Sequence, residues 1–180
     1  RIIHRLRSAS IGEQVRLLRN FAKEKPDAVV IECMAVNPQY QWVAEQKMIQ
    51  STISVMTNVR PDHLDEMGTS HKEIAYSLSN TIPCKSKLIT SENIYFDIFK
   101  KISNKRNTHI IQSTTDDIES DYIDNFPYIE HPENISLALK VCQELGVNKD
   151  KALEGMLNTN PDPGALLIWN IKNKNNFVSA

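Results

Sequence analysis

The stretch ISVMTNVRPDH, residues 53–63, decides the fold. Its first four residues, Ile53 to Met56, form a short and largely apolar run, which is typical of a strand buried on both faces. Polar residues follow, and Pro61 fixes a turn directly before Asp62 and His63. A buried strand that ends in a polar turn is the pattern of a parallel sheet whose loops carry function.

Similar short strands and intervening helices occur on both sides of this stretch. The other predicted strands are residues 28–31, 87–90 and 108–111, and the predicted helices are 11–24, 39–50, 70–79 and 92–103. Regular alternation of strands and helices predicts an α/β fold with a mostly parallel sheet flanked by helices. Beyond residue 115 the predicted elements are a short strand at 128–129, helices at 133–145 and 149–158, a rigid turn at 161–164 and a strand at 166–171.

The composition limits the classes of protein to which the chain can belong. A length of 180 residues fits one domain or a piece of a larger protein. With 21 basic and 22 acidic residues the net charge is -1, so we expect no nucleic-acid partner. The three cysteines lie far apart without a Cys-x-x-Cys pair, which favours a reducing compartment and argues against a thiolate zinc site.

Polar side chains follow two of the predicted strands. Glu32 comes directly after 28–31, and His63 follows the turn after Ile53 to Met56. In an open α/β sheet, ligands bind at the carboxyl ends of the strands. If the two strands are neighbours, Glu32 and His63 lie close together and, with water and phosphate oxygens, can hold Mg²⁺.

The same residues also fit a purely structural interpretation. Glu32 would pair with Arg60, and His63 would only cap a turn. A buried carboxylate needs a partner in either case, because burying an unpaired charge is costly. The spacing alone leaves both interpretations open.

Longer strings of sequence resemble a known family. They are IECMAVNP at 31–38, TNVRPDHLDEMG at 57–68, HPENISLAL at 131–139 and PDPGA at 161–165. Together they resemble the central domain of the Mur ligase superfamily and, within it, the poly-γ-glutamate synthase branch. The resemblance covers nearly the whole chain.

The resemblance implies an ATP-dependent amide ligase. In such an enzyme a glutamate γ-carboxylate attacks the ATP γ-phosphate, and the amino group of another glutamate then displaces phosphate to leave a γ-amide bond. By resemblance, Glu32 and His63 hold Mg²⁺, and Asn134 contacts the adenine of ATP. Sites of this kind work by positioning and by neutralising charge.

The chain departs from the family pattern at three points. The phosphate loop, a glycine-rich string ending in Gly-Lys-Ser/Thr, does not occur in the sequence. We therefore expect residues 1–180 to be a central-domain fragment, cut after that loop, without the C-terminal ligase domain and inactive by itself. Many Mur ligases carry a modified lysine fifteen residues after the histidine, but Leu78 stands at that position, which puts a second metal site in doubt.

The resemblance also implies partners and a location for the intact protein. The expected substrates are glutamate and growing poly-γ-glutamate, and the expected partners are membrane subunits of a capsule synthase complex. We expect the intact protein at the cytoplasmic face of the membrane and the chain itself to be soluble. Two alternatives remain, a folylpolyglutamate-synthase-like ligase and a non-catalytic assembly module; the string at 31–38 and the missing lysine favour the poly-γ-glutamate branch over the former.

Overall fold

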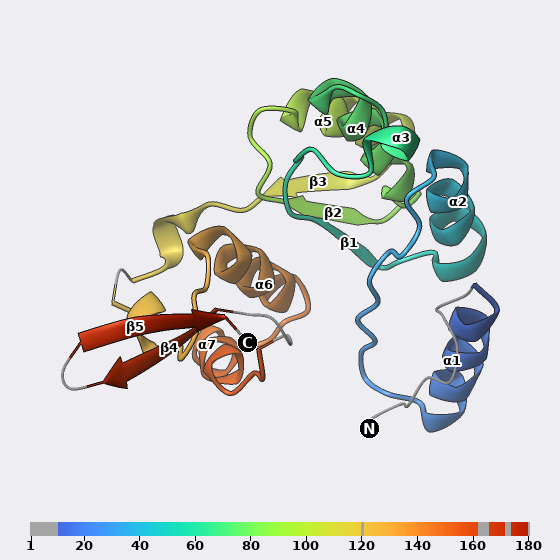
Figure 1. Cartoon of the computed structure of the whole chain (residues 1–180). Coiled ribbons are helices and arrows are strands. Elements are labelled where there is room, and N and C mark those ends of the chain that lie inside the picture. Colours follow the sequence, from blue (N-terminus) through green and yellow to red (C-terminus); the bar gives the residue numbers. More distant parts are fainter. Residues whose placement is uncertain (1–10, 120, 162–165, 172–173, 180) are drawn as a thin grey trace. The chain divides into compact units, whose positions relative to one another are not determined.

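The computed structural model describes residues 11–119, 121–161, 166–171 and 174–179 (Figure 1). The chain divides into two units, Arg1–Ala35 and Val36–Ala180, and each is described here by itself. The first unit contains the helix α1, Ile11–Glu24, with the bounds that its apolar spacing predicts.

Residues 28–31 do not form the predicted strand. Residues 25–35 contain neither helix nor strand, and Val29, Val30 and Ile31 are 43%, 99% and 37% exposed. A strand is stable only when its backbone N–H and C=O groups are paired. No strand among the described residues pairs with this segment. An apolar run alone therefore did not suffice to predict a strand.

The second unit is built on the predicted parallel sheet. Its strands are β1, Ile53–Met56, β2, Lys87–Thr90, and β3, His109–Gln112, in the order β1-β2-β3. Both strand pairs are parallel and span all four residues of each strand. The three predicted strands of this sheet are thus confirmed within one residue.

Helices cover both faces of the sheet (Figure 1). The helices of one face are α3, Leu64–Met67, α4, His71–Leu78, and α5, Phe96–Lys105. Leu88 of β2 belongs to a core cluster with Ile74 of α4 and Phe99 of α5, each at most 1% exposed. The next residue, Ile89, is also fully buried, and because neighbouring strand residues point to opposite faces it lies on the side where α6, Pro132–Glu144, contacts β2.

The segment before β1 is helical, as predicted, but its second half is wider than an α-helix. The helix α2, Pro38–Val43, continues into the π-helix η1, Ala44–Ile49. The carboxylate of Glu45 accepts hydrogen bonds from the backbone N–H and the hydroxyl of Ser51, at 2.9 and 3.1 Å, and so holds the turn that leads into β1. A 3₁₀ turn, η2, Ser79–Thr81, follows α4.

The remainder of the unit is less regular. It contains the 3₁₀ turns η3, Thr115–Asp117, and η4, Ile123–Asn125, the helix α7, Lys149–Leu157, and the antiparallel strands β4, Leu166–Ile171, and β5, Lys174–Ser179. Phe126, Tyr128 and Ile135 form a second buried cluster, in which the rings of Phe126 and Tyr128 meet edge to face. Around Tyr128 there is a single bridge residue where a short strand was predicted. Most of the predicted turn at 161–164 lies outside the described residues.

Candidate functional site

The loop that leaves β1 is fixed by the loop that leaves β2. The hydroxyl of Ser91 donates a hydrogen bond of 2.6 Å to the carbonyl oxygen of Thr57. The backbone N–H of Val59 donates to Oε2 of Glu92 at 2.8 Å. The first three residues after β1 are therefore tied at two points to the loop that follows the next strand of the sheet.

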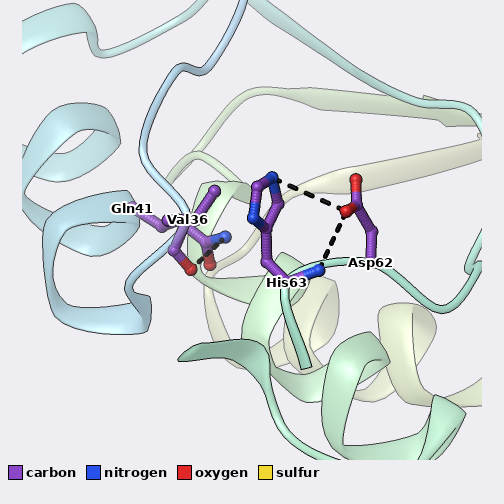
Figure 2. A network of polar contacts seen from close by, with 4 residues as sticks. All are labelled: Val36, Gln41, Asp62 and His63. Atoms are coloured by element: carbon purple, nitrogen blue, oxygen red, sulfur yellow. Dashed lines mark hydrogen bonds and ion pairs between the residues drawn. The ribbon is translucent and has the colours of Figure 1, made fainter. Parts of the chain in front are cut away.

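His63 lies at the end of this loop, directly before α3. Its backbone is left-handed, with φ 44° and ψ 50°, a conformation in which histidine is found more often than most residues. Its N–H donates to Oδ1 of Asp62 at 2.9 Å, and its Nε2 lies 3.6 Å from the same oxygen (Figure 2). The imidazole is 51% exposed and the Asp62 side chain 73% exposed. The contact between Asp62 and the ring is longer than a hydrogen bond, and the half-exposed imidazole stays accessible to a ligand.

The turn-capping interpretation of His63 fits only in part. His63 does occupy the position before the first residue of α3, and its carbonyl oxygen accepts from Glu66 and Met67. Its side chain, however, makes no capping hydrogen bond. The imidazole is therefore not needed to end the turn.

Asn37 connects the family-like string at 31–38 to α3. Its Nδ2 donates to Oε2 of Glu66 at 2.8 Å, and its Oδ1 accepts from the N–H of Gln39 at 3.0 Å, which caps α2. The hydrogen bond of Gln41 to the carbonyl oxygen of Val36, 3.2 Å, holds the same turn (Figure 2). The chain around Asn37 thus has a fixed place beside the helix that begins after His63.

Glu32 and Asn134 do not join His63 in a cluster that the structure defines. Glu32 is exposed and belongs to the unit Arg1–Ala35, so its predicted pairing with His63 stays a prediction. Asn134 is exposed in the first turn of α6, where its Nδ2 donates to Oε1 of Glu130 at 3.0 Å. The same carboxylate accepts from the N–H of His131 at 2.8 Å, and the His131 side chain makes no capping bond.

Glu92 is the residue that the sequence reasoning missed. It is only 6% exposed, and its carboxylate accepts three backbone N–H groups, those of Val59, Ile94 and Tyr95. Because these bonds hold residues 92–95 as a loop, α5 begins at Phe96 rather than at the predicted residue 92. Part of the signal was present, since Glu92 is the second residue after the predicted strand 87–90, whereas Glu32 directly follows the apolar run at 28–31.

The described residues hold no group of three or more His, Cys, Asp and Glu side chains that could bind a metal ion. Among the helices formed by those residues, none combines the length and the apolarity needed to cross a membrane.

Two curated relatives are similar over most of this chain. The capsule biosynthesis protein CapB of Bacillus anthracis is 41% identical over 167 residues, which is 93% of this chain and 36% of that protein. The PGA synthase CapB of Bacillus subtilis (strain 168) is 41% identical over 159 residues, 88% of this chain and 40% of that protein. The chain therefore spans less than half the length of either relative.

Solved structures share the fold at low sequence identity. A complex of FPGS with AMPPCP has a TM-score of 0.61 at 12% identity and covers 82% of this chain and 45% of that one. Folylpolyglutamate synthase from Thermotoga maritima has a TM-score of 0.60 at 16% identity, with 87% and 40% covered. These likenesses support the fold. The family of the Mur ligase middle domain matches residues 9–151, and with the parallel sheet and the two 41% identical relatives this places the chain in that family.

Proposed function

We propose that the full-length protein is an ATP-dependent amide ligase that forms γ-glutamyl bonds in the synthesis of a poly-γ-glutamate capsule. The observation that carries this proposal is the 41% identity, over 93% of the chain, to a relative named for capsule biosynthesis. Residues 1–180 would be a part of its central domain, because the family match covers 9–151 and the chain spans 36% of that relative.

The proposed reaction has two steps. The γ-carboxylate of one glutamate attacks the γ-phosphorus of ATP, which forms an acyl phosphate and releases ADP. The amino group of a second glutamate then attacks the acyl carbon, loses a proton, and expels inorganic phosphate as the γ-amide bond forms. A positioned array of charges and hydrogen bonds is sufficient for both steps.

We propose that His63 and Glu32 hold Mg²⁺, which would neutralise charge on the ATP phosphates. The site fits such an ion because Mg²⁺ keeps several waters and needs only a few protein ligands beside phosphate oxygens. The His63 ring is half exposed and the Asp62 carboxylate lies 3.6 Å from its Nε2, which supports such a role. Glu32 is five residues from Asn37, which is bonded to α3, so an extended chain can place it at most about 18 Å from that anchor.

Asn134 is proposed to contact adenine. An asparagine amide offers one acceptor and two donor hydrogens, which match the amino group and a ring nitrogen of adenine. Its place in the first turn of α6 leaves the side chain exposed, and only the Nδ2 to Glu130 bond has to give way. Asn134 would therefore select the base and not act on the phosphates.

The alternative substrate is a folate, as in the folylpolyglutamate synthases that share the fold. That likeness rests on solved structures at 12% and 16% identity, whereas the capsule relatives are 41% identical. The fold-only likeness therefore carries less weight. We further propose, from the family resemblance alone, membrane partner subunits and a location at the cytoplasmic membrane face.

The test uses the purified full-length protein with ATP, Mg²⁺ and glutamate or poly-γ-glutamate. It measures the rate of ADP release and the rate of polymer growth. His63→Ala should lower both rates by about 100-fold or more, because a ligand close to the transferring phosphate acts on the transition state. His109→Ala is the matched control, since His109 is also exposed but begins β3 at the opposite end of the sheet.

The same assay separates the alternatives. ADP release that requires a folate acceptor would replace the capsule substrate with the alternative one. Absence of ADP release with either acceptor would favour the non-catalytic assembly module. Equal rates in His63→Ala and His109→Ala would refute the role of His63.

A further inference from the structure

Glu92 is a buried carboxylate whose hydrogen bonds are all to backbone groups of two loops. Oε1 accepts from the N–H groups of Ile94 and Tyr95 at 2.7 and 3.1 Å, ahead of α5. Oε2 accepts from the N–H of Val59 at 2.8 Å, in the loop after β1. With an exposed fraction of only 6%, the side chain has little access to water, which could otherwise replace these bonds.

The three donors require an acceptor on both branches of the side chain. A carboxylate provides this, because both of its oxygens accept and neither donates. A glutamine of the same shape would place an NH₂ group against either Val59 or the Ile94–Tyr95 pair, so one contact would become repulsive. The site therefore distinguishes glutamate from glutamine by chemistry and not by size.

The loop held by Glu92 is the one that carries His63. Val59 is 8% exposed within the core cluster and lies four residues before His63, with Pro61 restricting the backbone between them. At the far end of the segment, Met67 of α3 packs against the same core cluster. The exposed His63 thus lies on a short segment that is fixed on both sides.

We propose that Glu92 is a positioning residue, which sets the place of His63 by holding the backbone at Val59. Loss of this hold leaves the Ser91–Thr57 hydrogen bond before Val59 and the packing of Met67 after His63, and lets the backbone between them sample other paths. The consequence is weaker binding of a divalent cation at His63. The proposal rests on the proposed role of His63 as a metal ligand. The effect of Glu92 on the mobility of the loop can, however, be measured in the absence of metal.

The experiment compares full-length wild type, Glu92→Gln, His63→Ala and Glu144→Gln. Glu144→Gln is the matched control, because it makes the same chemical change at the residue whose carboxylate binds Lys87 at the other end of β2. Two quantities are measured: deuterium uptake of peptides covering residues 57–63 in the metal-free protein, and Mn²⁺ affinity in the presence of AMPPCP by electron paramagnetic resonance. Thermal melting checks that each variant is folded.

Glu92→Gln should increase the deuterium uptake of residues 57–63 and weaken Mn²⁺ binding by about 10- to 100-fold, the usual effect of removing a group that orients a metal ligand. Glu144→Gln should stay within twofold of wild type in both quantities. Unchanged uptake in folded Glu92→Gln overturns the proposal, whatever His63→Ala does. Increased uptake with unchanged Mn²⁺ affinity also overturns it, provided that His63→Ala weakens binding.

A failure of the proposed metal-binding role of His63 gives a different result from a failure of the positioning role of Glu92. If His63→Ala binds Mn²⁺ as wild type does, His63 is not a metal ligand and the link from Glu92 to metal binding is overturned. Glu92→Asp provides a further readout, since its carboxylate keeps two acceptor oxygens on a shorter arm. Recovery of at least part of the Mn²⁺ affinity by Glu92→Asp, relative to Glu92→Gln, supports positioning by a carboxylate, and no recovery contradicts it.

Discussion

Ser103 is a fully buried residue of α5 whose hydroxyl has no hydrogen-bond partner among the described residues. Burial of a hydroxyl without a partner is unfavourable, because its hydrogen bonds to water are lost and not replaced. Alanine also favours a helix more than serine does. Ser103→Ala should therefore increase the free energy of unfolding, by about 0.5–1 kcal/mol.

Ser79 provides the matched control for this substitution. It is also buried, at 3% exposure, but its hydroxyl donates a hydrogen bond of 2.7 Å to the carbonyl oxygen of Ala75. Ser79→Ala removes a satisfied bond and should lower the free energy of unfolding. Urea denaturation of both variants tests the pair, and a destabilised Ser103→Ala would show that its hydroxyl does have a partner.

Among single residues, His63 and Asn134 were chosen because they stand in strings that resemble a family, and their proposed roles stay predictions. Both side chains are exposed in the structure. Glu92 was missed because its role depends on the N–H of Val59, 33 residues away, and no local pattern predicts that contact.

Among the helices, α4 offers a pH-dependent test of its first turn. Ser70 and Glu73 form a capping box, in which the Glu73 carboxylate accepts from the N–H and the hydroxyl of Ser70, both at 2.9 Å. These hydrogen bonds lower the pKa of Glu73 from 4.5. Since the folded pKa lies below the unfolded one, the stabilisation is fully present above pH 4.5 and is lost as pH falls through the folded pKa.

Because the pKa of Glu73 is lowered by folding, Glu73→Gln should be less stable than wild type at neutral pH. The difference should shrink below pH 4.5, where the wild-type carboxyl becomes protonated. Denaturant unfolding between pH 3 and 7 measures it. In a Ser70→Ala background the pH dependence should be weaker, and an undiminished one would assign the effect to another group.

The strands show where a local pattern is enough and where it is not. The short stretches predicted as strands at 53–56 and 87–90 pair in the sheet with those bounds, and the one predicted at 108–111 pairs at 109–112. Residues 28–31 have the same pattern but remain unpaired and exposed. A short apolar stretch indicates what a segment gains from burial, whereas strand pairing also depends on whether a free strand edge is available to it.

For the molecule as a whole, we expect the exposed segment 25–35 to be the first site of proteolytic cleavage. Val30 is 99% exposed, and the segment has no helix or strand to protect its backbone. Limited thermolysin digestion of the full-length protein should cut near Val29 to Ile31 before it cuts within the sheet. Mass spectrometry of the early fragments identifies the site.

Nucleotide should slow this cleavage if Glu32 takes part in a metal site. We expect AMPPCP with Mg²⁺ to protect the segment in wild type and to protect it less in Glu32→Gln, because a bound ligand stabilises the conformation that holds it. Equal protection in both proteins would argue against Glu32 as a ligand. First cleavage inside β1, β2 or β3 would contradict the exposure of the segment.

The double tie between the loops after β1 and β2 also bears on recombination between relatives. Thr57 is bonded to Ser91 and Val59 to Glu92, so the two loops depend on each other although 30 residues separate His63 from Ile94. A chimera that exchanges residues 57–63 without 91–95 would pair each backbone group with a foreign partner. Crossovers that keep both loops from one parent should therefore yield functional offspring more often than crossovers that fall between them.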